Sequence, residues 1–352
     1  MPTKAFDPNG VIPDNGNYFG MPLEPEDAAL VLISAPWDAT VPHRAGTSYA
    51  PDAIIEASRQ IDFHEPNAPY SWRKGIATLP IDYAIQDLSH RLRSEALRTV
   101  KVLEELGLSA LENMIYSRRL RRVNEGSVEI NDNIYRQAKE WLGRGKIVGL
   151  VGGEQSTAYG LIRAVGEECG HFGILHIDSN CDLRERYLGF EHSYASIMHN
   201  VLRDVKQVDK LVAVGVREFS PQEWERAMSD ERIELFTGQH IWSSHFEGVN
   251  WSTTCENIIA KLPEKVYVSL DIDGLTIECS PHTSSSVPGG LRFPEVVYLL
   301  GKIVASGRSI VGFDLTEVVP DMDDKTDAVI AARLLFKLCS MALKNHEAEY
   351  VL

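Results

Sequence analysis

The sequence predicts an α/β protein of three layers, α/β/α, in which helices cover both faces of a mostly parallel central sheet. From about residue 130 onward, short apolar runs typical of strands alternate with segments whose apolar residues recur at helical spacing. Strands joined through helices run parallel, since each crossover returns the chain to the same edge of the sheet. The runs are apolar at successive positions, as expected for strands that are covered on both faces.

The first part of the chain is less regular. Residues 1–26 contain Pro, Gly and Asn without periodicity and are predicted to form an irregular arm. An apolar run at residues 28–33 predicts a buried strand. Pro51 begins a predicted helix through Ala57, because proline is favoured in a first helical turn. Helical spacing of apolar residues predicts a further helix over residues 88–106.

The remaining chain carries the alternation of strands and helices. Strands are predicted at residues 147–151, 172–177, 211–215, 266–270 and 310–314. Helices are predicted at residues 134–142 and 327–343, and another follows the first of these strands. Since no composition break and no internal repeat marks a second domain, we predict one domain over residues 27–352.

The composition limits the partners and the compartment. The chain has 35 basic and 50 acidic residues, and its net charge of −15 argues against nucleic acid or an anionic membrane as the main partner. No hydrophobic stretch is long enough to span a membrane, and the N-terminal residues do not resemble a signal peptide. The five scattered cysteines form neither a disulfide framework nor a C-x-x-C metal site. We therefore expect a cytoplasmic protein.

Two short carboxylate clusters follow two of the predicted strands. Asp178 and Asp182 follow one strand, and Asp271 and Asp273 follow another. In an open parallel sheet the carboxyl ends of the strands meet at one edge, where ligands bind. Four carboxylates gathered there repel one another unless a cation neutralises them or their pKa values rise. The sequence therefore predicts a divalent-metal site at this edge.

Several strand-end motifs occur in order along the chain. They are Gly152-Gly153-Glu154-Gln155-Ser156, Asp178-Ser179-Asn180-Cys181-Asp182, Ser269-Leu270-Asp271-Ile272-Asp273 and Asp314-Leu315-Thr316-Glu317-Val318-Val319-Pro320. Together they resemble the ureohydrolase family, which contains arginase, agmatinase, formiminoglutamase and proclavaminate amidinohydrolase. The family patterns are Gly-Gly-Asp-His-Ser, Asp-Ala-His-x-Asp, Ser-x-Asp-x-Asp and Asp-x-x-Glu-x-x-Pro. The resemblance is strongest over residues 147–335 and weaker in a helical stretch at about 85–130.

The resemblance implies an oligomeric subunit, a trimer or hexamer, with two Mn²⁺ ions whose bridging hydroxide attacks the central carbon of a guanidinium or amidine. Carried onto this chain, it implies the metal ligands Gln155, Asp178, Asn180, Asp182, Asp271 and Asp273. It also implies that His192 shuttles protons and that Glu317 pairs with the guanidinium of a small-molecule substrate.

Both metal-binding histidines of the family are replaced here, by Gln155 and Asn180. An amide oxygen is a weaker ligand than imidazole for first-row transition metals, and the resulting all-oxygen set suits Mg²⁺, Ca²⁺ or Mn²⁺. Mn²⁺ is the ion that the resemblance favours. The alternative is that both amides form hydrogen bonds inside an inactive site.

Two loops that would set the substrate, residues 38–48 and 276–288, depart most from the family. In the second loop the family's Pro-Gly-Thr-Gly-Thr-Pro is replaced by residues 281–286. The candidate substrate contacts are Glu317, His282, Thr283 and Ser284. A solvated loop position is the alternative for His282. These loops do not identify the substrate.

Three functions are consistent with these residues. The first, favoured by the four aspartates, is a metal-dependent hydrolase of a C–N bond in a guanidino or amidino compound. The second is a non-catalytic protein of the same fold that binds a ligand or regulates a partner. The third is an enzyme with metal-independent chemistry that uses Glu317, His192 or Cys181. Two further histidines, His171 and His176, are expected to be core residues with satisfied hydrogen bonds.

Overall fold

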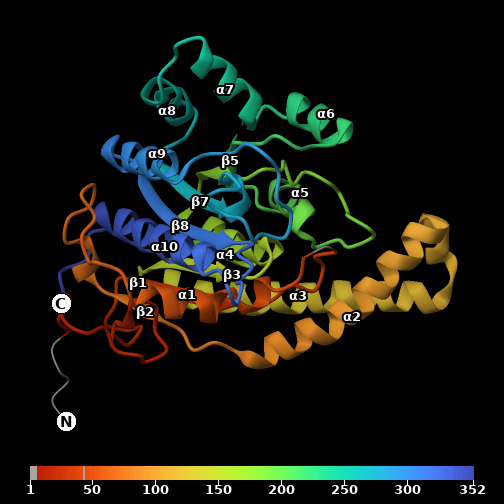
Figure 1. The fold of residues 1–352 in the computed structure, drawn as a ribbon, viewed down its shortest axis with the longest axis horizontal. Coiled ribbons are helices and arrows are strands. Elements are labelled where there is room, and N and C mark those ends of the chain that lie inside the picture. The colour runs from red at the N-terminus through yellow and green to blue at the C-terminus, as the bar shows by residue number, and fades with distance from the viewer. Residues whose placement is uncertain (1–5, 43) are drawn as a thin grey trace.

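One sheet of eight parallel strands forms the centre of the computed structural model, which describes residues 6–42 and 44–352 (Figure 1). The strands are β1 (Leu30–Ala35), β2 (Ile76–Thr78), β3 (Ile147–Gly152), β4 (Phe172–Ile177), β5 (Val208–Val214), β6 (Ile233–Phe236), β7 (Lys265–Asp271) and β8 (Ser309–Thr316). Their order is β2-β1-β3-β8-β7-β4-β5-β6, and every pairing is parallel. The predicted α/β fold is confirmed, and the sheet is wholly rather than mostly parallel.

Helices cover both faces of this sheet. They are α1 (Ala50–Ser58), α2 (Tyr83–Leu106), α3 (Met114–Leu142), α4 (Ala158–Cys169), α5 (Ile197–Asp204), α6 (Pro221–Ser229), α7 (Gly238–Phe246), α8 (Trp251–Ala260), α9 (Phe293–Ala305) and α10 (Thr326–Lys344). One apolar cluster joins the sheet to α1, α8, α9 and α10, and a second joins it to α2, α3, α4 and α5. The two clusters make the three layers. Among the described residues, none of the helices combines the length and apolar character that crossing a bilayer requires.

Two strands were missing from the sequence prediction. β2 and β6, at the two edges of the sheet, have only three and four residues. Short edge strands leave little apolar pattern to read, and most of β6 is only half-buried. The predicted strand at residues 28–33 is shifted, since β1 begins at Leu30.

The predicted N-terminal arm is packed onto the domain where it is described; residues 1–5 lie outside the described residues. Tyr18 and Phe19 are fully buried. The Tyr18 hydroxyl lies 2.9 Å from the Ser34 hydroxyl, and the Phe19 amide donates to Ser58 Oγ at 2.8 Å. The division into an arm and one domain stays a prediction.

The weakly matching stretch at about 85–130 is a helical hairpin. α2 and α3 pack against each other and extend beyond the edge of the sheet, joined by a short 3₁₀ helix at Leu108–Glu112 (Figure 1). Asp82 and Asn113 cap the two helices, each accepting a backbone hydrogen bond through its side chain. Through α3 the hairpin packs against β1, β3 and the 3₁₀ turn Gln155–Thr157, next to the strand ends that form the site described next.

Candidate metal centre

The candidate residues meet at the carboxyl ends of the four adjacent central strands β3, β8, β7 and β4. Asp178 follows β4, and Asp271 ends β7. Gln155 follows β3, and Glu317 follows β8. Because these strands are parallel neighbours, four segments that are distant in the sequence deliver their polar side chains to one place.

The four aspartates are buried there, with exposed fractions of 1% for Asp178, 3% for Asp182, 4% for Asp271 and 5% for Asp273. They form two groups around a shared Asp178. Carboxylate oxygens of Asp178, Asp271 and Asp273 all lie within 4.8 Å of one another. Oxygens of Asp178 and Asp182 likewise lie within 4.8 Å of each other and of a nitrogen of His176. Each group has the spacing of ligands around one cation.

The electrostatics of this cluster are unfavourable without a counter-ion. Burial raises the pKa of Asp178 well above its usual value, and the charges of Asp182 and Asp273 raise it further. The pKa of Asp271 is likewise raised by burial and then by the neighbouring charges of Asp273 and Asp178. The carboxylates therefore need either protons or a cation to coexist.

Gln155 lies inside the centre. Its side-chain Nε2 donates to Asp178 Oδ2 at 3.1 Å, and its backbone amide donates to Glu317 Oε1 at 2.8 Å. Its Oε1 is buried and has no hydrogen-bond partner. A carbonyl oxygen without a hydrogen-bond partner beside aspartates is available as a ligand for a cation.

Asn180 lies at the rim instead and is half-buried. Its backbone amide donates to Asp178 Oδ1 at 2.6 Å, which fixes that carboxylate. Its side-chain oxygen accepts a hydrogen bond of 2.7 Å from the Ser179 hydroxyl, while Nδ2 faces the Glu218 carbonyl at 3.4 Å. The two amides that replace histidines therefore differ: only Gln155 presents an unpaired oxygen. The assignment of both as ligands stays a prediction.

Glu317 borders the same centre. Its backbone is left-handed, with φ of 61°, a conformation unusual for a residue with a side chain. Oε1 accepts the Gln155 amide, and Oε2 accepts the Ser284 hydroxyl at 2.6 Å. Burial raises the pKa of Glu317 to about 8. Two hydrogen bonds thus hold the Glu317 carboxylate in one orientation, and burial disfavours its ionised form.

The loop with His282, Thr283 and Ser284 contacts Glu317 through the Ser284 hydroxyl. Thr283 pairs with Val318 in a β-bridge, which sets Ser284 beside Glu317. The His282 ring contacts Asp327 of α10, with Nδ1 2.7 Å from Oδ2. The roles of these three residues as substrate contacts stay predictions.

His192 does not contact the aspartates. Its ring packs edge-on against Tyr159 of α4, with centroids 5.1 Å apart. Burial lowers the pKa of His192, and the nearby Arg203 lowers it further. Its predicted role as a proton shuttle is not tested by this placement.

Two residues border the centre without any signal in the sequence. Burial is the main cause that raises the pKa of Tyr194. The neighbouring Tyr187 raises it further, and so do the charges of Glu317 and Asp182. Arg217 donates to the carbonyl oxygens of Asp273 at 2.6 Å and Val287 at 3.0 Å, which ties the substrate loop to the metal centre. Neither lies in a family motif, so only the packing of the loops reveals them.

Of the two expected core histidines, His171 is exposed, and His176 is in the core but lacks the predicted hydrogen bonds. The His171 side chain is 70% exposed and contacts Asp209. His176 is fully buried, yet neither ring nitrogen has a hydrogen-bond partner. Its Nε2 lies 2.9 Å from Asp178 Oδ2. The sequence did contain the signal, because residues two apart on a strand point to the same side.

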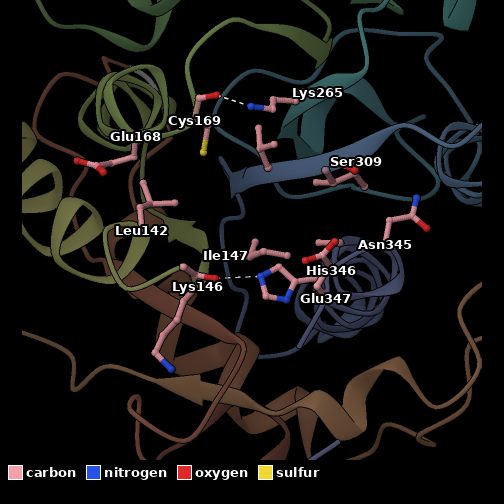
Figure 2. A pocket seen from close by; sticks show the side chains of 14 residues that line it. Leu142, Lys146, Ile147, Glu168, Cys169, Lys265, Ser309, Asn345, His346 and Glu347 are labelled. Atoms are coloured by element: carbon pink, nitrogen blue, oxygen red, sulfur yellow. Dashed lines mark hydrogen bonds between the residues drawn. The ribbon is translucent and has the colours of Figure 1, made fainter. Parts of the chain in front are cut away.

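A separate cavity of about 520 Å³ lies at the amino ends of the central strands, opposite the candidate metal centre (Figure 2). Ile147, Lys265 and Ser309, the first residues of β3, β7 and β8, line it. In Figure 2, the Lys265 ammonium donates to the Cys169 carbonyl, and His346 contacts the carbonyl of Gly145. Since the aspartates follow the other ends of these strands, this cavity is not part of the metal centre.

Comparison with known proteins agrees with this architecture. The sequence model of the arginase family matches residues 28–340. N(1)-aminopropylagmatine ureohydrolase of Thermus thermophilus is 27% identical over 327 residues, which cover 93% of this chain and 94% of that protein. Agmatinase of Pyrococcus horikoshii is 24% identical over 91% of this chain and 94% of its own length. Proclavaminate amidino hydrolase from Streptomyces clavuligerus has a similar structure, with a TM-score of 0.71 and 20% identity over 96% of this chain and 100% of that one.

Proposed function

Because this chain belongs to the arginase family, we propose that it hydrolyses a C–N bond in a guanidino or amidino small molecule. The buried aspartate cluster beside Glu317 is the observation that supports this function most directly. The similarity to an agmatinase and an aminopropylagmatine ureohydrolase supports a guanidino substrate. A cationic substrate also suits a chain with a net charge of −15.

The residues present fit a divalent cation. Two groups of donors share Asp178, the Gln155 oxygen has no partner, and the pKa values of the aspartates are raised by burial and mutual repulsion. A cation offsets that repulsion and satisfies the orphaned oxygen. Mn²⁺ is the ion we propose, with Mg²⁺ or Ca²⁺ as the alternatives that oxygen ligands allow.

In this mechanism the side chains of the protein hold the cations and orient the substrate. Bound divalent cations supply Lewis-acid activation of water and substrate. Asp178, Asp182, Asp271 and Asp273 hold them in a buried, water-poor site. The Glu317 carboxylate, fixed by Ser284 and the Gln155 amide, binds the planar guanidinium, which favours the ionised form of the carboxylate.

Urea release tests this function. The Mn²⁺-loaded protein is incubated with agmatine, arginine and an aminopropyl-substituted agmatine, and urea is measured. We expect urea from at least one of them, and a loss of 100-fold or more, on the order of one oriented catalytic interaction, in Asp271→Asn and in Glu317→Gln. Circular dichroism checks that both variants are folded. Urea release that survives a chelator, or that Asp271→Asn leaves intact, would refute metal-dependent hydrolysis.

One observation favours a second candidate, a non-catalytic ligand-binding or regulatory protein. The Gln155 amide donates to Asp178 in place of a histidine that would ligate a metal. Tight binding of agmatine without any urea release identifies this alternative. No observation favours the third, metal-independent function, because burial raises the pKa of the Cys181 thiol and keeps it from being a thiolate.

A further inference from the structure

We propose that His176 supplies the nitrogen ligand of this metal centre, binding one cation together with Asp178 and Asp182. The inference rests on the proposed metal-dependent function. It assigns a ligand on β4 itself, whereas the two replaced positions, Gln155 and Asn180, lie in the loops after β3 and β4. It also replaces the all-oxygen ligand set that the sequence predicts.

The first argument is geometric. His176 is on β4, two residues before Asp178, so both side chains leave the strand on the same side. The His176 Nε2 lies 2.9 Å from Asp178 Oδ2 and 3.8 Å from Asp182 Oδ2. Ligands bound at about 2.1 Å to one cation are about 3.0–3.5 Å apart. The two observed separations bracket that range.

The second argument is the lack of any other partner. Both ring nitrogens of His176 are buried without a hydrogen bond, although a carboxylate oxygen is 2.9 Å away. The short contact does not have the direction of a hydrogen bond. Buried polar atoms in native proteins are paired, and a cation between the ring and the two carboxylates would pair this one.

The third argument concerns the remaining donors. The Asn180 side chain is engaged with Ser179 and Glu218, so both of its polar atoms already have partners. Gln155 offers an oxygen but no nitrogen lone pair. His176 is therefore the nitrogen donor in the group with Asp178 and Asp182. One imidazole shifts the preference of that group from Mg²⁺ and Ca²⁺ towards Mn²⁺ and later first-row metals.

Pulsed electron paramagnetic resonance of the full-length protein loaded with Mn²⁺ tests the assignment. An imidazole bound to Mn²⁺ gives a ¹⁴N coupling, and labelling the histidines with ¹⁵N shifts it. We expect this coupling in the unmodified protein and its loss in His176→Gln. We also expect Mn²⁺ affinity, measured by calorimetry, to fall at least about tenfold in that variant. His282→Gln is the matched control, since it removes another ring that contacts a carboxylate, and it should keep the coupling.

The outcomes separate the two proposals. Mn²⁺ that binds without a histidine ¹⁵N shift overturns the role of His176 and leaves the hydrolase proposal standing. A coupling that persists in His176→Gln also overturns it. Failure to bind Mn²⁺ at all overturns the metal centre on which both proposals rest. If His176→Gln does not fold, the double variant His192→Gln and His282→Gln decides: a retained coupling supports His176, and a lost one overturns it.

Discussion

Asp314 is a buried carboxyl group next to the metal centre and outside the proposed ligand set. Its Oδ1 accepts a hydrogen bond from the Ser269 hydroxyl at 3.1 Å, and Oδ2 has no partner. Burial raises its pKa to about 7 from 3.8. Since the folded state holds this proton more tightly than the unfolded chain, Asp314 makes the protein lose stability as pH rises from about 4 to about 7.

We therefore expect Asp314→Asn to stabilise the metal-free protein at pH 8, by on the order of 4 kcal/mol, and to change little at pH 4. The asparagine keeps the shape and cannot ionise. Urea unfolding of both proteins at several pH values measures the difference. The control is Asp87→Asn, which removes an exposed carboxylate of α2. A difference between Asp314→Asn and the unmodified protein that does not grow with pH would contradict this account.

Also at the residue scale, the sequence predicted which residues meet at the strand ends better than it predicted where their side chains point. Asp178, Asp271 and Glu317 could be placed together because each directly follows an apolar strand. The turn of the His192 ring onto Tyr159 and the position of Tyr194 near Glu317 depend on how the loop at 183–196 packs. No local pattern encodes that packing, so these features could not be predicted.

At the scale of elements, the close approach of β1 and β3 explains a glycine in the loop after β3. A Cβ at Gly153 would lie 2.0 Å from the carbonyl oxygen of Trp37 and 2.7 Å from that of Ala35. Neither backbone oxygen can move freely, because Ala35 ends β1 and accepts the Gly153 amide. Glu154 next to it accepts hydrogen bonds from the Thr40 amide and hydroxyl, which fix the loop.

Gly153→Ala should accordingly destabilise the protein by about 3 kcal/mol or more, the size expected for forced overpacking of rigid backbone. Gly143→Ala is the matched control, since that glycine ends α3 with φ of −64° and its nearest obstacle is 3.1 Å away. Thermal unfolding of both variants is the measurement. Equal stability of the two variants would mean that the β1–β3 loops adjust more easily than the contacts indicate.

Long strands with a continuous apolar pattern were predicted more accurately than short ones. The central strands β3, β4, β7 and β8 were placed to within two residues of each end, because all are apolar and buried on both faces. The edge strands β2 and β6 were missed since three or four residues carry no periodicity. The site was therefore predictable at its acidic centre and unpredictable at its margins.

At the scale of the whole molecule, metal binding and folding are linked. A cation that binds only the folded chain adds about 2.7 kcal/mol to the free energy of unfolding at 100 times its Kd. We expect Mn²⁺ to raise the melting temperature at pH 8 and a chelator to reverse the rise. Asp271→Asn should abolish most of the effect. An equal rise in this variant would show that Mn²⁺ binds elsewhere.

The larger assembly remains a matter of prediction. From the resemblance to the family we expect a homo-oligomer, a trimer or hexamer. Sedimentation velocity of the purified protein gives the number of subunits.

The strand order also has a consequence for the chain as it leaves the ribosome. Gln155 and Glu317 are joined by a hydrogen bond across 162 positions, because β8 inserts between β3 and β7. A nascent chain that ends before β8 has a sheet with its middle strand absent. Long-range pairing of this kind is slow, and it closes only when nearly all residues have been made. Since Glu317 directly follows β8, the sheet and the candidate metal centre are both completed only when β8 has been made.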